Sequence, residues 1–158
     1  MDPHNLRRSL TATLLQQVER EEALLRTALT NVTGLNDALR SGNLAHGREI
    51  CAGQPDLAHA LHDAAEARGA AAAALARELG LAPDGATLAA LAERLSPDLQ
   101  AEILAARTRL TALTSDLSAI QARNANLTAH LRSFFRGVLS ETTAADAPPR
   151  YGPTGRRI

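Results

Sequence analysis

Aromatic residues are nearly missing from this chain. Among its 158 residues there is no tryptophan, and there are only two phenylalanines and one tyrosine, which excludes a core built on large aromatic side chains. Lysine is missing as well, because all 17 basic residues are arginine, and they are balanced by 17 acidic residues. A chain without net charge has no overall electrostatic attraction to nucleic acid or to an anionic membrane, so we predict neither as a partner.

Cysteine and long apolar runs are equally scarce. Cys51 is the only cysteine, which excludes an internal disulfide and leaves no pair of thiols for a metal site. The longest apolar run begins at Gly69 and is too short and too rich in alanine to span a bilayer. The sequence begins without the apolar stretch of a secretion signal, so we expect a cytoplasmic protein without direct membrane insertion.

The abundant residues are alanine, leucine, arginine and glutamate, which all favour helices. No segment shows the two-residue alternation of a strand, so the predicted fold class is all-α. Capping residues, glycines and prolines divide the chain into three long helices and a short one. The predicted helices cover about residues 3–40, 44–80, 87–95 and 97–139.

Two features of the earlier helices affect their packing. In the first helix, apolar residues recur every three or four positions, and Glu21 is the single polar interruption. In the second helix, Pro55 either kinks one helix or begins a new one. The many alanines between Ala64 and Ala76 would let a neighbouring helix approach closely.

The last helix carries the clearest pattern. Its apolar residues alternate in steps of four and three, which is a coiled-coil heptad repeat with Asn124 as its one polar member. We call this set the heptad stripe: Leu99, Ile103, Ala106, Leu110, Leu113, Leu117, Ile120, Asn124, Leu127, Leu131, Phe134 and Val138. Long helices of this kind pack as an elongated antiparallel bundle or helical hairpin, and part of the stripe can remain open to a partner.

The chain divides into two parts. Residues 1–140 are predicted to form one helical domain. Residues 141–158 show no periodicity and contain several prolines and glycines, so they are predicted to form a disordered tail. The only tyrosine, Tyr151, lies in this tail.

The densest group of ionisable residues offers little chemistry. Asp56, His59, Asp63 and Glu66 share one helix face, and a carboxylate three residues before a histidine resembles the spacing of helical di-iron ligands. The facing helices lack a matching histidine pair, so we favour a solvated polar face over a metal site. The chain also has no nucleophile elbow and no phosphate loop. We therefore predict no catalytic, metal or cofactor site, and no enzyme activity.

Both phenylalanines lie near the end of the last helix, between Arg132 and Arg136. Phe134 continues the heptad stripe and Phe135 widens it. The pair could cap the bundle core, bind a partner protein or lie on a membrane surface, although two arginines are few for membrane attraction. Asn124 has two interpretations as well: a buried residue that sets the helix register, or part of a face left open for a ligand.

Four segments form a recognisable combination: "ALRSGN" after the first helix, "LARELGL" at the end of the second, "IQARNANLTAHLRSFF" in the last, and "YGPTG" in the tail. Together they resemble the FlgN family of flagellar export chaperones, over nearly the whole chain. The resemblance implies a cytoplasmic, all-helical chaperone without enzyme activity. Such a protein would bind the terminal helical segments of hook–filament junction proteins before type III export.

The resemblance also implies which residues bind the partners. In the family the client contacts are associated with the C-terminal helical region, and here the predicted client surface consists of six residues: Ile120, Asn124, Leu127, Leu131, Phe134 and Phe135. The family's tail tyrosine is associated with docking on the cytoplasmic domain of a membrane component of the export gate. That role would fall to Tyr151, with Gly152 beside it.

The heptad stripe leaves one alternative function open. A helix with this repeat could also pair with copies of itself, which would make the chain a self-assembling structural coiled-coil protein. A stable dimer or filament in solution would favour that alternative. A monomer that binds one client segment would favour the chaperone.

Overall fold

The structure is a computed structural model that describes residues 3–145, with side chains for residues 4–137. Its helices are α1 (Pro3–Ser41), α2 (Leu44–Ala52), α3 (Gln54–Glu78), α4 (Leu88–Ala92) and α5 (Pro97–Ala145). No strand occurs within residues 3–145, which confirms the all-α fold class.

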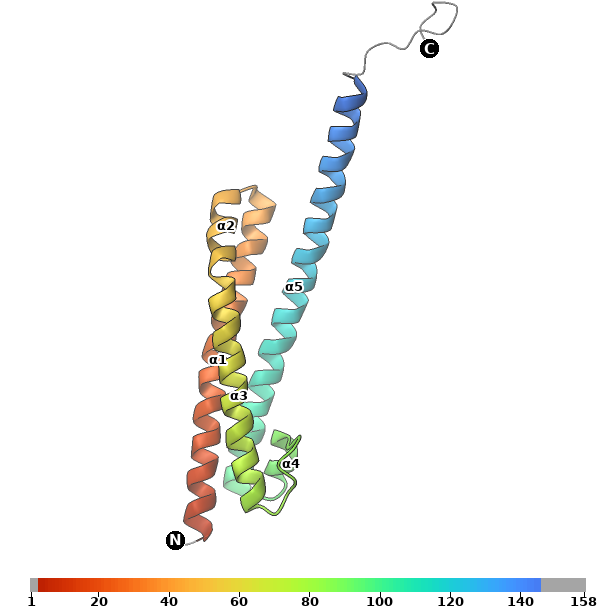
Figure 1. The fold of residues 1–158 in the computed structure, drawn as a ribbon. Coiled ribbons are helices and arrows are strands. Elements are labelled where there is room, and N and C mark those ends of the chain that lie inside the picture. Colours follow the sequence, from red (N-terminus) through yellow and green to blue (C-terminus); the bar gives the residue numbers. More distant parts are fainter. Residues whose placement is uncertain (1–2, 146–158) are drawn as a thin grey trace, which may run out of the picture.

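The helices form an elongated bundle (Figure 1), in which α1 contacts α2, α3 and α5. The chain runs along α1, returns through α2 and α3, and then runs along α5 in the same direction as α1. The backbone of α1 runs close to both α3 and α5, whereas the described parts of α3 and α5 approach one another less closely. The short helix α4 contacts both of them near the end of the bundle where α5 begins.

Glycines and caps end the first helices as predicted. Gly42 ends α1 with a φ of 73°, a left-handed conformation that glycine adopts without strain. Asn43 then caps α2, because its side-chain oxygen accepts a hydrogen bond from the backbone N–H of His46 at 3.2 Å. The predicted second helix is in fact two helices, separated at Gly53, and Pro55 lies in the first turn of α3. Proline fits there because the first turn needs no N–H donor from it.

The last two helices differ from their predicted lengths. Thr87 caps α4 through a hydrogen bond that its hydroxyl oxygen accepts from the N–H of Ala90, and the helix is only five residues long. α5 continues to Ala145, so it is longer at its C-terminal end than the sequence predicted. Residues 141–145 of the predicted tail therefore belong to this helix, and residues 146–158 lie outside the described part of the chain.

The hydrophobic core lies at the α4 end of the bundle. It unites side chains from four helices: Leu14, Val18, Ala72, Leu75, Ala76, Leu88, Leu91, Ala92, Ile103 and Ala106. Two alanines of α3, Ala72 and Ala76, belong to this core. Their small side chains let the neighbouring helices pack closely against α3, as the sequence predicted. The core thus holds only the first part of α5, and the rest of that helix depends on α1.

Candidate functional site: an open surface on α5

Burial along the heptad stripe decreases towards the C-terminal end of α5. Ile103 and Ala106 are fully buried in the core. The stripe residues from Leu110 to Ile120 are half-buried against α1. Phe134 and Phe135 are 64% and 58% exposed. An apolar repeat that begins in a core and ends in solvent indicates a surface that a partner can cover.

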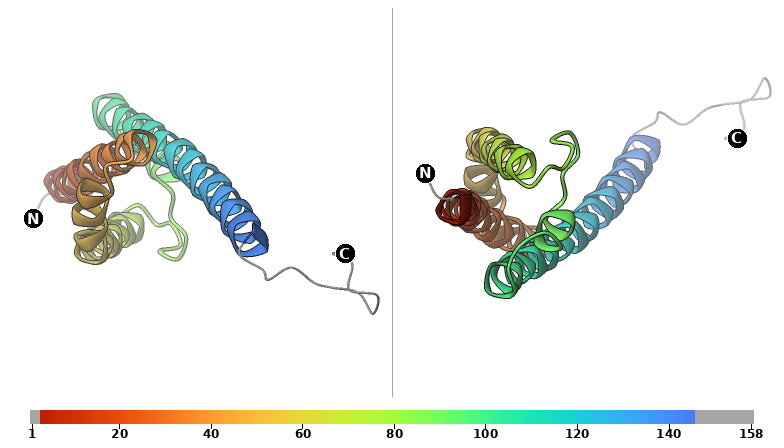
Figure 2. Two further views of the ribbon diagram at one scale, coloured as in Figure 1. Left: turned by 90° about the horizontal axis from the view of Figure 1, so that it is seen from above. Right: turned by 90° about the horizontal axis from the view of Figure 1, so that it is seen from below.

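The arrangement of the helices explains this exposure. α5 crosses α1 at an angle, and its C-terminal part lies to one side of the other helices and projects past the turn between α1 and α2 (Figures 1 and 2). The rings of Phe134 and Phe135 pack edge to face, with centroids 5.7 Å apart and planes at 70°. The two phenylalanines therefore do not cap the bundle core, and that interpretation is wrong.

The aliphatic members of the predicted client surface are less open. Ile120, Leu127 and Leu131 are all half-buried. Ile120 lines a groove of about 300 Å³ between α1 and α5, together with Leu29 of α1. A partner side chain could enter this groove without displacing a helix.

Asn124 occupies a different position from the other five residues. It is only 8% exposed, and its side-chain N–H donates to the carbonyl oxygen of Val32 at 2.9 Å. Its side-chain oxygen accepts a hydrogen bond from the Asn36 side chain at 2.7 Å. The amide is therefore committed to α1, as expected for an asparagine that sets helix register. Asn124 is not part of the open surface.

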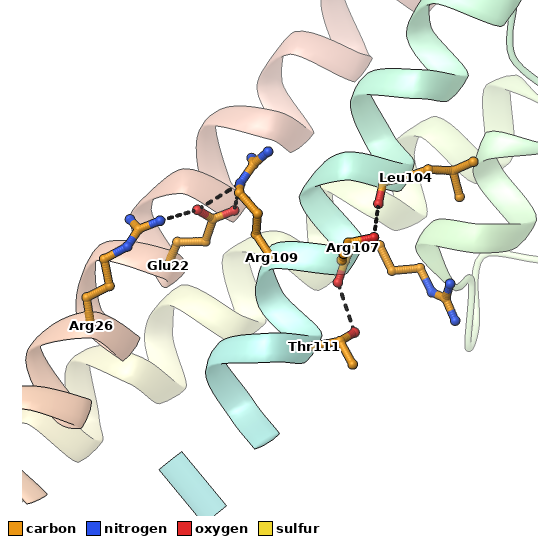
Figure 3. Close-up of polar contacts among 7 residues, drawn as sticks. Glu22, Arg26, Leu104, Arg107, Arg109 and Thr111 are labelled. Carbon is orange, nitrogen blue, oxygen red and sulfur yellow. Dashed lines mark hydrogen bonds and ion pairs between the residues drawn. The ribbon is translucent and has the colours of Figure 1, made fainter. Parts of the chain in front are cut away.

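A second polar contact between α1 and α5 was not predicted from the sequence. Glu22 of α1 is only 3% exposed, and its carboxylate accepts hydrogen bonds from Nε of Arg109 on α5 at 2.9 and 3.2 Å (Figure 3). Arg26, one turn along α1, donates to the same carboxylate at 3.0 Å. Buried carboxylates are stable when such charged donors satisfy them. Glu22 and Asn124 thus mark two places where polar side chains hold α5 on α1.

Glu21 has a different partner. Glu21 was predicted as the polar interruption of the apolar pattern, but Glu22 is the buried carboxylate there. Glu21 is half-buried and forms an ion pair with Arg68 of α3. Adjacent carboxylates on α1 therefore contact two different helices, because neighbouring helix positions point in directions about 100° apart.

A small apolar pocket lies between the end of α1 and α2. It has a volume of about 310 Å³ and is lined mainly by apolar side chains, among them Leu35 and Leu39 of α1 and Leu44 of α2. Leu44 is 71% exposed. The end of the bundle beside the open part of α5 thus carries a further apolar feature (Figure 1).

The ionisable group on α3 does not form a metal site in the described structure. Within residues 4–137, no three His, Cys, Asp or Glu side chains lie close enough to hold a metal ion. Glu66 of that group lies 3.4 Å from Nε2 of the neighbouring His62, and both side chains are exposed. Tyr151 and Gly152 lie outside the described residues. None of the described helices is long and apolar enough to cross a membrane.

The comparison with protein families supplies the context for this surface. The family model described as "FlgN protein" matches residues 8–157, which is nearly the whole chain. The chain belongs to the FlgN family. FlgN proteins are flagellar export chaperones, not enzymes, and they bind flagellar substrate proteins. No curated protein and no solved structure matches the chain significantly.

Proposed function

We propose that this FlgN protein binds the terminal helical segments of hook–filament junction proteins in the cytoplasm and delivers them to the flagellar export gate. The observation that supports this proposal is the exposure of Phe134 and Phe135 on the part of α5 that projects past the bundle. In this proposal five residues form the client-binding surface: Ile120, Leu127, Leu131, Phe134 and Phe135.

The physics of such binding is that of a helix in a groove. A client helix with one apolar face can cover the open part of the heptad stripe, and the burial of apolar area supplies most of the affinity. Exposed aromatic side chains are the strongest anchors at protein interfaces. Because apolar burial is insensitive to screening, we expect salt to weaken the complex only mildly.

Replacement of both phenylalanines tests the client surface. The double substitution Phe134→Ala and Phe135→Ala should weaken binding of a junction protein's terminal segment by at least about tenfold, because two aromatic anchors are lost. Isothermal titration calorimetry with the full chain measures this change. Leu104→Ala is the matched control, since Leu104 is 37% exposed on the bundle part of the same helix. Equal affinities for the wild-type chain and the double variant would refute the proposal.

The tail is proposed to dock on the export gate through Tyr151, with Gly152 beside it. A tyrosine offers a large apolar face and a hydroxyl group at a small cost in rotamer entropy, which suits a docking peptide. Tyr151→Ala should reduce export of junction proteins and binding to the cytoplasmic domain of the gate component. Helicity and client affinity should stay unchanged. Normal export by this variant would show that the tail has another role.

A further inference from the structure

The open part of α5 has an uneven charge. Between Leu117 and Gly137 the sequence has no aspartate and no glutamate, but it has three arginines, in a chain whose total charge is zero. The nearest acidic residues along the helix are Asp116 and Glu141. The apolar surface proposed for the client therefore lies in a locally basic stretch.

The basic residues lie on both sides of the heptad stripe. At 100° per residue, Arg123 and His130 fall beside the edge of the stripe that carries Phe134. Arg132 lies about 60° beyond Phe135 on the opposite side of the stripe, within reach of a long side chain, and Arg136 lies about 40° further round the helix, away from the stripe. A helix laid along the stripe would thus meet a positive side chain at either edge.

These arginines are available to a partner. Arg123, Arg132 and Arg136 are exposed, and none of them forms an ion pair with a carboxylate of residues 4–137. Among residues 4–137, Arg136 donates to the carbonyl oxygen of Arg132, at 3.5 Å. Arg123 lines the groove beside Ile120, and the one acidic residue of that groove, Asp116, makes no ion pair with it.

Some arginines of the bundle do form ion pairs. Arg26 and Arg109 are bound to Glu22, and Arg68 is bound to Glu21. Arg7 reaches Glu78 of α3 at 3.4 Å. Other exposed arginines of the bundle, such as Arg94 and Arg107, also form no ion pair within residues 4–137. What distinguishes Arg123 and Arg132 is therefore their position beside an open apolar stripe in a segment without acidic residues, and this position favours an acidic partner.

We propose, building on the client-binding function above, that this surface selects an amphipathic helix whose apolar face is bordered by aspartate or glutamate residues. Arg123 and Arg132 contact those carboxylates from opposite edges of the stripe. The arginines determine which helix is accepted, while apolar burial supplies most of the affinity.

Charge also decides between the possible occupants. A second copy of α5 on this stripe would place arginines near arginines, and like charges across a helix pair are destabilising. An anionic membrane would also attract the arginines, but three are few for stable binding to a lipid surface. An acidic helix satisfies both the apolar stripe and its basic borders.

Three synthetic peptides test the proposal. Each has about 25 residues, long enough for a helix to form on binding, and all share one apolar face. The positions bordering that face are glutamate in the first peptide, glutamine in the second and arginine in the third. Fluorescence anisotropy with the full chain should give the highest affinity for the glutamate peptide and the lowest for the arginine peptide.

Charge reversal in the protein completes the test. Arg123→Glu with Arg132→Glu should weaken binding of the glutamate peptide about tenfold and strengthen binding of the arginine peptide. The matched control is Arg94→Glu with Arg107→Glu, because both arginines are exposed and form no ion pair within residues 4–137. This control should leave the order of the three peptides unchanged.

The other outcomes are equally informative. If all three peptides bind alike, and only Phe134→Ala with Phe135→Ala weakens them, the charge selection is refuted while the client-binding function stands. The chain could instead bind vesicles of phosphatidylcholine and phosphatidylglycerol and none of the peptides. If the reversal of Arg123 and Arg132 abolished that vesicle binding, the partner of this surface would be a membrane and not an acidic helix. No binding to peptides or vesicles would refute the selection and the client surface together.

Discussion

Glu22 carries a carboxylate but lies on the buried face of α1. It follows Val18 by four residues and precedes Leu25 by three, and all three side chains are buried. Its charge is tolerated because two arginines donate to it, and the Arg109 side chain keeps 46% of its surface exposed. A half-exposed guanidinium retains part of its hydration, so only the carboxylate loses most of its contact with water.

We expect Glu22→Ala to lower the free energy of unfolding by about 2 kcal/mol, because charge-assisted hydrogen bonds between α1 and α5 are lost. Glu22→Gln should lower the free energy of unfolding by a smaller amount, since the amide keeps one acceptor oxygen. Urea denaturation followed by circular dichroism measures both values.

The matched control is Glu19→Ala. Glu19 is exposed on the same helix, so its replacement should change the free energy of unfolding by no more than about 0.5 kcal/mol. Equal stability of the two alanine variants would mean that the contact between Glu22 and Arg109 does not hold α5 on α1.

The buried role of Glu22 could not be predicted from the sequence. Three acidic residues lie close together on α1, and the apolar spacing predicted Glu21 as the polar interruption, whereas Glu22 is the carboxylate that is turned inwards. The choice depends on which arginine of another helix lies within reach. That is a property of tertiary packing, with Arg109 some 87 residues away.

At the scale of elements, the spacing of apolar residues and the capping and turn residues predicted most of the fold. Gly42, Asn43 and Thr87 define helix ends through local backbone chemistry, which depends only on neighbouring residues. The break at Gly53 was one of two possibilities, because Pro55 is compatible with both a kink and a helix start. The end of α5 was misplaced because the alanines and threonines after Ser140 are weak stop signals.

The open surface on α5 was partly predictable. The heptad stripe identified the residues that need a partner, but a repeat does not show how far along the helix the rest of the bundle reaches. The core ends well before the stripe does, because α4 and the N-terminal turns of α5 close one end of the bundle only. The same repeat therefore contains Asn124, held by α1, and Phe134, exposed to solvent.

Backbone protection in the free chain should follow this burial. Amide hydrogens of residues 125–137 should exchange faster than those of residues 100–115, because the later segment of α5 has fewer buried contacts and opens at a lower free energy. Hydrogen–deuterium exchange read by mass spectrometry compares the two segments directly. Equal protection along α5 would indicate a partner or a packing arrangement that covers the C-terminal part already in the free chain.

At the scale of the whole molecule, the bundle combines a closed end with an open one. The closed end holds the core and the ion pair between Arg7 and Glu78. The open end presents the two exposed phenylalanines, and the apolar pocket between α1 and α2, with the exposed Leu44, lies near the same end but away from α5. Under the proposed function, this asymmetry would let a client bind at one end without disturbing the core contacts at the other end.

The central question is whether the exposed stripe serves a client or another copy of this chain. Analytical ultracentrifugation of the full chain, alone and with the terminal helical segment of a junction protein, answers it most directly. We predict a monomer that becomes a one-to-one complex, and a monomer in both samples when Phe134 and Phe135 are replaced by alanine. A stable dimer that the same two substitutions dissociate, and that takes up no client segment, would contradict the account.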